Sequence, residues 1–89
     1  FQLIIDDGAV KALQTNKSLL LPGIINVKGE FEKNEIVEIF SVVGGSVAYG
    51  KTAYSSKEIQ SALSLRKNDK QLTLPKEVIH HDYMVMLKV

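Results

Sequence analysis

Short segments rich in β-branched residues, separated by turn signals, constrain this fold more than any other feature of the sequence. Four apolar segments have the composition of strands: residues 3–5, 24–27, 35–40 and 84–87. Gly44-Gly45 follows the third segment and favours a tight hairpin, because glycine adopts positive φ at little cost. The return strand is then predicted at residues 47–49. We expect five or six short strands, joined mainly by hairpins rather than by crossover helices.

Two segments carry the signals of a helix start. Asp6 and Asp7 follow the first predicted strand, and either carboxylate can cap a helix near residues 8–13 by accepting backbone N–H bonds. Asn16 is predicted to end that helix, because asparagine tolerates the left-handed conformation. Ser55 and Glu58 have the spacing of a capping box, which predicts a second helix from this point.

Polar and proline signals continue beyond the second helix. Residues 67–71 are predicted to form a polar loop, and Thr73-Leu74-Pro75 resembles the start of a third helix. His80-His81-Asp82 reads as a turn before the last strand. The whole pattern predicts a mostly β fold with small helices, an α+β domain of barrel-like form.

Length and composition limit what the chain can do. It has 89 residues, 45% of them hydrophobic, which is enough for one small domain and too few for a nucleotide-binding α/β sheet or a TIM barrel. It has no cysteine, which excludes disulfides, thiolate catalysis and cysteine-based metal sites and fits a cytoplasmic protein. Apolar runs such as Leu19-Leu20-Leu21 are too short to span a membrane. Because the chain lacks an initiator Met and begins within a predicted strand, we expect residues 1–89 to be one domain excised from a longer protein.

One segment matches the phosphate-binding P-loop pattern but lacks its context. Residues 45–52 fit G-x-x-x-x-G-K-[ST], in which backbone amides cradle phosphates. A P-loop follows a buried parallel strand and leads directly into a helix. Here the residues between the glycines have a strand pattern, and the next helix signal comes only at Ser55. We therefore predict that this segment is a strand without a nucleotide.

The His80-His81-Asp82 segment raises two further alternatives. A metal site is disfavoured. Adjacent histidines on a strand point to opposite faces, and although a turn could relax this, the chain has no third histidine and no cysteine. A catalytic triad with Ser55 or Ser56 is disfavoured because no nucleophile elbow is visible. We expect a turn in which Asp82 binds local backbone, and we assign no catalytic, cofactor or metal residue.

A second group of residues has the chemistry of an anion or RNA site. It combines a helix start, lysines and a Pro-Gly turn, which together can hold phosphates. The candidate residues are Gly8, Lys11, Lys17, Ser18, Pro22 and Gly23. Residues 51–76 carry a basic surplus downstream of an acidic stretch at residues 30–38, although the net charge is only +1. Tyr49 and Tyr54 can stack on bases, but tyrosines at strand spacing are more often half-buried core.

The sequence resembles a PUA domain, and more narrowly the C-terminal PUA domain of bacterial glutamate 5-kinases. The resemblance rests on these segments, in the family's order: residues 5–9, 17–20, 29–32, 50–58 and 77–80. It makes Gly50 a strand glycine and predicts a β pseudo-barrel. Asn34-Glu35 stands where PUA domains usually have Gly-Asp, and His81 stands where arginine is common. The second departure removes a positive charge and weakens the RNA interpretation.

The resemblance also implies a parent enzyme that transfers phosphate from ATP to the side-chain carboxylate of glutamate, the first step of proline biosynthesis. ATP and magnesium would bind a preceding amino-acid-kinase domain, so this domain is expected to be catalytically silent and free of cofactors. Its implied partners are that kinase domain within a homo-oligomeric parent, and RNA. Two roles stay open: a structural or regulatory appendage of the kinase, which we favour, or an RNA-binding module of an RNA-modifying protein.

Overall fold

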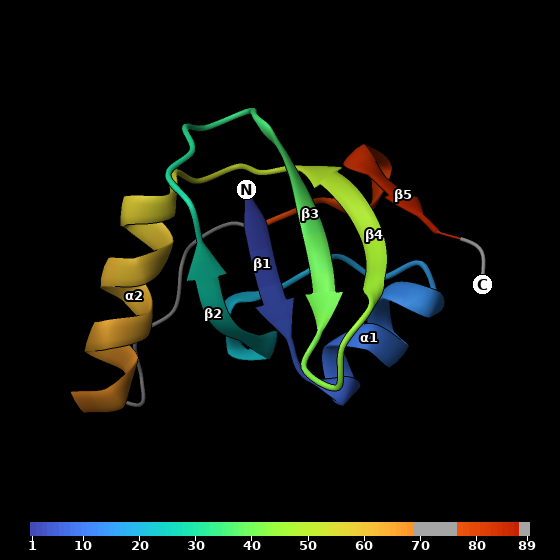
Figure 1. Cartoon of the computed structure of the whole chain (residues 1–89), viewed down its shortest axis with the longest axis horizontal. Helices are drawn as coiled ribbons and strands as arrows, with labels where there is room; N and C mark the ends of the chain where they lie inside the picture. The colour runs from blue at the N-terminus through green and yellow to red at the C-terminus, as the bar shows by residue number, and fades with distance from the viewer. Residues whose placement is uncertain (69–76, 88–89) are drawn as a thin grey trace.

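The computed structural model describes residues 1–68 and 77–87, and a five-stranded mixed sheet organises this part of the chain (Figure 1). The elements follow in the order β1 (Gln2–Ile5), α1 (Asp7–Gln14), the 3-10 turn η1 (Leu21–Gly23), β2 (Ile24–Lys28), β3 (Ile36–Ser41), β4 (Ser46–Lys51), α2 (Ser56–Asn68), the 3-10 turn η2 (His81–Tyr83) and β5 (Met84–Met86). The strand order across the sheet is β2-β1-β3-β4-β5. The predicted class, mostly β with small helices, is confirmed.

The prediction that hairpins dominate the connections was wrong. β3 and β4 form a tight hairpin through Gly44 and Gly45, which have φ of 102° and 94° as predicted. The antiparallel pairs β1–β2 and β4–β5 are instead linked through helical segments, and β1 pairs with β3 in parallel. Turn signals report only local geometry, whereas these pairings bring together segments far apart in the sequence and are set by burial of the core.

The predicted start and end of α1 are confirmed. Asp6 is the N-cap residue, and its Oδ1 accepts a hydrogen bond of 2.7 Å from the Ala9 amide. Asn16 has φ of 62° just beyond the helix, in the left-handed region expected for an asparagine that ends a helix.

The capping box before α2 is also confirmed. The Glu58 amide donates to Ser55 Oγ at 3.2 Å, and the Ser55 amide donates to Glu58 Oε1 at 3.0 Å. The helix continues to Asn68, so the polar loop predicted from residue 67 begins too early. Polar residues are equally compatible with the exposed end of a helix, which explains this error. The predicted third helix start, Thr73-Leu74-Pro75, lies outside the described residues.

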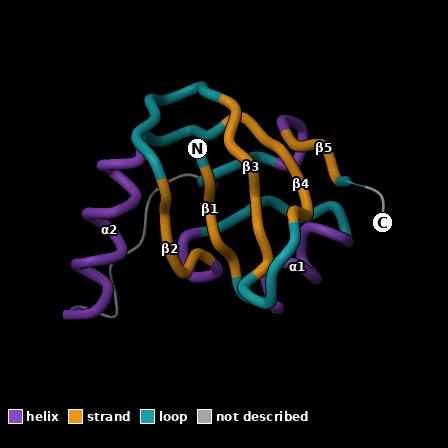
Figure 2. The backbone as a smooth tube through the Cα atoms, in the orientation of Figure 1, coloured by secondary structure: helices purple, strands orange, loops and turns teal. Residues whose placement is uncertain are grey.

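The core lies on one face of the sheet, between the strands and the segments that pass behind them (Figure 2). β1, β3 and β4 contribute Leu3, Ile5, Val37, Ile39 and Ala48. The covering segments contribute Leu13, Leu19, Leu21, Ile59, Val78 and Ile79. Leu19 and Ile79 also form an antiparallel bridge outside the sheet, so the chain before η1 is tied to the chain before η2.

The opposite face of the sheet is only partly covered. Ile4, Glu38 and Phe40 are half-buried there, and Tyr49 is 40% exposed. Across the described residues, no helix is long and apolar enough to cross a membrane.

Candidate functional site

The predicted anion site lies where η1 approaches α1. The Asp6 amide donates a 3.0 Å hydrogen bond to the Gly23 carbonyl. A Cβ atom on Gly23 would lie 2.6 Å from Ala9 Cβ, so only glycine permits this approach. The two elements leave a pocket of about 290 Å³. It is lined by Asp6, Ala9, Ala12, Ser18, Leu19, Leu20, Pro22 and Gly23.

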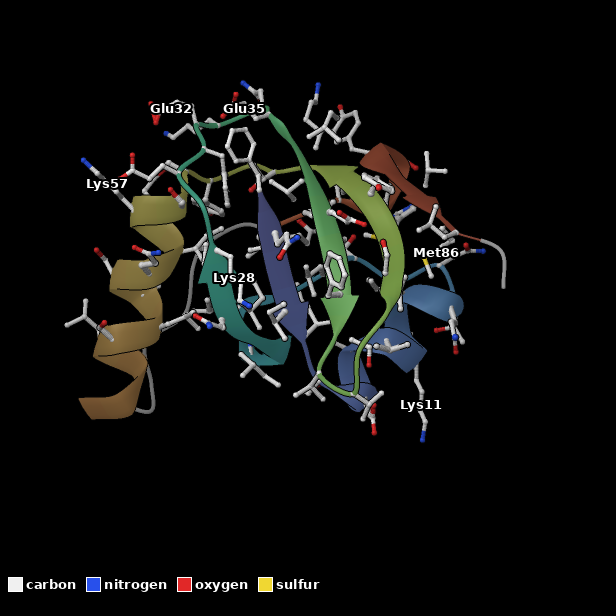
Figure 3. The ribbon with its side chains drawn as sticks, viewed as in Figure 1. Lys11, Lys28, Glu32, Glu35, Lys57 and Met86 are labelled. Carbon is white, nitrogen blue, oxygen red and sulfur yellow. The ribbon has the colours of Figure 1, made fainter. Side chains whose placement is uncertain are left out.

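The structure brings together half of the predicted site residues. Ser18, Pro22 and Gly23 line the pocket. Gly8, Lys11 and Lys17 are exposed and are not among its lining residues. The side chain of Lys11 extends from α1 away from the body of the domain (Figure 3). Whether these six residues bind RNA or another anion stays a prediction.

The electrostatics of this pocket oppose an anion at the helix start. Phosphates bind helix N-termini because the first backbone amides are unpaired and the helix dipole is positive there. Here the Asp6 carboxylate already accepts from the Ala9 amide, and Asp7 adds a second negative charge in the first turn. A phosphate would have to displace or approach these carboxylates. The cap predicted from the sequence therefore works against the anion site predicted beside it.

Three of the described lysines lie on different elements and far from one another. Lys11, Lys28 and Lys57 lie on α1, β2 and α2 and are well separated in Figure 3. The rest of the predicted basic stretch, residues 66–76, lies outside the described side chains. Strong phosphate binding requires several cations along one face, and Lys11, Lys28 and Lys57 do not form such a face.

The P-loop interpretation is excluded by the structure, as predicted. Residues 46–51 are strand β4 itself. Thr52 is fully buried, and its Oγ1 donates to the Tyr54 carbonyl at 2.8 Å. Its hydroxyl is therefore committed to the turn that precedes α2. Lys51 lies with Nζ 4.7 Å from the centre of the Tyr83 ring, a cation–π contact.

A second pocket, which no sequence signal predicted, lies between the end of β4 and η2. Its volume is about 480 Å³. It is lined by Asn34, Lys51, Thr52, Ala53, Glu77, His80, Asp82 and Tyr83. These residues come from three parts of the chain: residue 34, residues 51–53 and residues 77–83. The β4–β5 pairing brings them together, with hydrogen bonds from the Asn34 amide to the Thr52 carbonyl at 2.7 Å and from the Ala53 amide to the Val78 carbonyl at 2.8 Å.

Adjacent histidines would point to opposite faces on a strand, but His80 and His81 begin a 3-10 turn instead. Their rings stack with centroids 4.3 Å apart. The turn itself was predicted correctly. Its local hydrogen bond runs from the Asp82 amide to His80 Nδ1 at 3.1 Å, so the histidine ring, rather than the Asp82 carboxylate, accepts the backbone bond.

The two serines considered for a catalytic triad are engaged in structural hydrogen bonds. Ser55 Oγ accepts from the Glu58 amide. Ser56 is 3% exposed, and its Oγ pairs with the amide and the carbonyl of Phe31, at 3.1 Å and 3.3 Å. Both hydroxyls therefore hold α2 and the loop before β3 in place.

The two candidate stacking tyrosines differ in exposure. Tyr54 is 8% exposed and belongs to the core. Tyr49 lies on the partly covered face of the sheet, where a hydrogen bond to the Glu38 carboxylate, and the negative charge of that group, raise its pKa above 10.0. Of these two tyrosines, Tyr49 is the one whose ring another molecule could contact.

Comparison with known proteins identifies the family. A model of the PUA domain matches residues 1–71 of this chain. The chain belongs to the PUA domain family. The turn residue Asn34, which replaces the family's usual glycine, has φ of 70°, so this departure leaves the PUA turn intact.

This PUA domain is also similar to the C-terminal region of bacterial glutamate 5-kinases. It is 40% identical over 88 residues to glutamate 5-kinase 1 of Bacillus subtilis, covering 98% of this chain and 24% of that protein. Its sequence identity is 38% over 87 residues to the glutamate 5-kinase of Aquifex aeolicus and 37% over 81 residues to that of Corynebacterium glutamicum. The chain spans less than a quarter of the length of these curated relatives.

Solved structures support the same fold. A PUA domain of Aeropyrum pernix K1, in complex with tartrate, matches with a TM-score of 0.73 at 19% identity, covering 89% of this chain and 40% of that one. A protein of an archaeal box H/ACA sRNP complex matches with a TM-score of 0.62 at 31% identity. That match covers 65% of this chain and 19% of the other.

Proposed function

We propose that this chain is the PUA domain of a glutamate 5-kinase and serves it as a structural or regulatory appendage. The observation that carries the proposal is 37–40% identity to such kinases over nearly the whole domain. The parent would transfer phosphate from ATP to the glutamate side chain, giving glutamyl 5-phosphate, the first step of proline biosynthesis, in the cytoplasm. Its ATP and magnesium would bind outside this domain, in an amino-acid-kinase domain.

The chemistry of the described residues agrees with a non-catalytic role. The serines of the candidate triad are committed to hydrogen bonds within the fold. The P-loop match is a strand whose threonine is buried. The functional contribution of the domain is then its contact with the kinase domain, within a homo-oligomeric parent.

Deleting residues 1–89 from the parent kinase tests this role. The truncated enzyme is expected to keep glutamate-dependent ATP turnover, because the catalytic residues lie elsewhere. Its sedimentation coefficient should change beyond the lost mass, or its response to proline, which the resemblance to glutamate 5-kinases implies for the parent, should shift. Sedimentation explained by mass alone, together with an unchanged inhibition curve, would contradict the proposal.

RNA binding is the second candidate, favoured by the similarity to a protein of an RNA-containing sRNP complex. In this role Ser18, Pro22 and Gly23 would form the floor of the site, and Lys11 and Lys17 would contact phosphates from its rim. The Asp6 cap and the dispersed lysines oppose this role, which is why we place it second.

A fluorescence anisotropy titration with structured RNA distinguishes the two functions. RNA binding predicts an affinity that falls steeply as salt rises, because phosphate contacts release counterions. The Lys11→Gln/Lys17→Gln double variant should bind more weakly and show a shallower salt dependence, with Lys57→Gln as the matched control. A flat titration at low salt would eliminate this candidate.

A further inference from the structure

His80, His81 and Asp82 form a compact cluster of metal-ligating groups at η2. One ligand atom from each residue can be chosen so that all three atoms lie within 4.8 Å of one another. The Asp82 carboxylate lies near a nitrogen of each ring: Oδ1 is 3.3 Å from His81 Nε2, and Oδ2 is 3.6 Å from His80 Nδ1. No other such group occurs among residues 1–68 and 77–87.

A second observation comes from a distant part of the chain. Ser18 Oγ lies 3.3 Å from His81 Nδ1 and accepts the His81 amide hydrogen bond at 3.0 Å. Metal-binding histidines usually form a hydrogen bond through their other ring nitrogen, which fixes the tautomer and the ring orientation. If Nε2 of His81 binds a metal, Nδ1 carries the proton and can donate it to Ser18 Oγ. The ring is therefore already held with Nε2 directed at Asp82.

The cluster is also accessible. The side chains of His80, His81 and Asp82 are 38%, 47% and 69% exposed. His80 and Asp82 line the 480 Å³ pocket together with Glu77 and Lys51. A bound ion could complete its coordination there with water or with a carboxylate ligand, without disturbing the core.

We propose that His80, His81 and Asp82 form a binding site for a divalent ion of the Zn²⁺ class, with Ser18 as the residue that positions His81. Two imidazoles and one carboxylate suit Zn²⁺, Co²⁺ or Ni²⁺ better than Mg²⁺ or Ca²⁺, which prefer all-oxygen sites. Binding requires small movements that bring the ligand atoms closer together and release the Asp82 amide from His80 Nδ1. The site is independent of the ATP-bound magnesium proposed for the parent kinase.

The test uses the 89-residue chain without a histidine tag, freed of metal by a chelator. Co²⁺ is titrated first and followed by its visible d–d absorption, and Zn²⁺ is then added in competition. The chain has only two histidines, so spectral evidence of imidazole ligation reports on this cluster alone. We expect saturable binding of one ion per chain and displacement of Co²⁺ by Zn²⁺.

Four variants and one control assign the ligands. His80→Gln, His81→Arg and Asp82→Asn remove ligands from exposed positions, so each should weaken Zn²⁺ binding at least about tenfold without unfolding the domain. Ser18→Ala should weaken binding by about 10–100-fold while leaving the number of bound ions at one. Glu32→Gln removes an exposed carboxylate far from η2 and should bind as the native chain does (Figure 3). Circular dichroism of each variant checks the fold.

The results distinguish a specific metal site at His80, His81 and Asp82 from nonspecific metal binding. Absence of a saturable Co²⁺ band would overturn the proposal, as would equal Zn²⁺ affinity in the native chain and the Asp82→Asn and His81→Arg variants. Loss of affinity in Glu32→Gln equal to that in Asp82→Asn would attribute binding to general negative charge and also overturn it.

Discussion

Gly50 shows how one residue can fix the position of a neighbouring segment. A Cβ atom on this β4 residue would lie 2.7 Å from Ile79 Cγ2 and 3.2 Å from the Tyr83 carbonyl oxygen. Ile79 is fully buried, so its methyl group cannot move aside without disturbing the core. The glycine thus allows the segment before η2 to pack directly on β4.

Alanine at Gly50 is therefore expected to destabilise the domain by about 1–3 kcal/mol through overpacking. Gly8→Ala is the matched control. Its new methyl group lies in α1, no closer than 3.5 Å to Asp6 Oδ1, and should stabilise by about 0.4–1 kcal/mol by restricting the unfolded chain. Urea unfolding measures the change in the free energy of unfolding for each variant, which should be negative for Gly50→Ala and positive for Gly8→Ala. Equal changes would show that the close approach at Gly50 does not affect stability.

The capping box is the clearest case in which an element follows from local sequence. Glu58 accepts from the Ser55 amide, and this hydrogen bond is the main reason that its pKa lies below 4.5; the Ser55 hydroxyl and Lys33 act in the same direction. Lys33 Nζ is 3.9 Å from Glu58 Oε2. Because the pKa is lower in the folded chain, ionised Glu58 stabilises the fold above about pH 4.5, and this stabilisation is lost as the pH falls through the lowered value.

The expected result for Glu58→Gln is a stability deficit at neutral pH that shrinks as the pH falls below 4.5. Ser55→Ala should lower the free energy of unfolding by about 0.5–2 kcal/mol at neutral pH. It removes the hydroxyl that accepts from the Glu58 amide, which has no partner within the helix. Lys57→Gln changes an exposed residue on the same helix, so its free energy of unfolding at neutral pH should stay within about 0.5 kcal/mol of that of the native chain. Urea unfolding from pH 3 to 7 measures these differences; a deficit for Glu58→Gln that grows toward low pH would refute the assignment.

Local signals were predictable from the sequence, and long-range arrangements were not. The Asp6 cap, the positive φ of Asn16 and Gly44-Gly45, and the capping box all depend on residues within a few positions of each other. The parallel β1–β3 pairing and the second pocket depend on which distant segments share the core. The Ser18–His81 contact spans 63 positions, so no local pattern indicates it.

For the candidate site, the sequence located the pocket but not its electrostatics. Ser18, Pro22 and Gly23 were correctly grouped because the turn before β2 brings them near α1. The position of Lys11 depends on how α1 is rotated against the sheet, and that of Lys17 depends on the course of the chain after α1. Residue types alone specify neither. The stacking of His80 on His81 was missed because the prediction of a turn does not specify how its side chains are oriented.

At the scale of the whole molecule, the described chain is a five-stranded mixed sheet with its core on one face. Its sheet buries one face against α1, α2 and the segments bridged by Leu19 and Ile79, and leaves the other partly open. The domain covers less than a quarter of the length of the glutamate 5-kinases to which it is similar. Under the proposed function, the rest of such a protein would carry out the phosphate transfer.

Tandem mass spectrometry of the native protein that carries this sequence, reading its intact mass and the residues before Phe1, tests the central claim most directly. We predict a polypeptide about four times the length of this domain, in keeping with its coverage of the relatives, with an amino-acid-kinase sequence upstream. A native chain that begins near Phe1, or one in which this domain follows an RNA-modifying domain, would contradict the kinase assignment and make RNA binding the leading function.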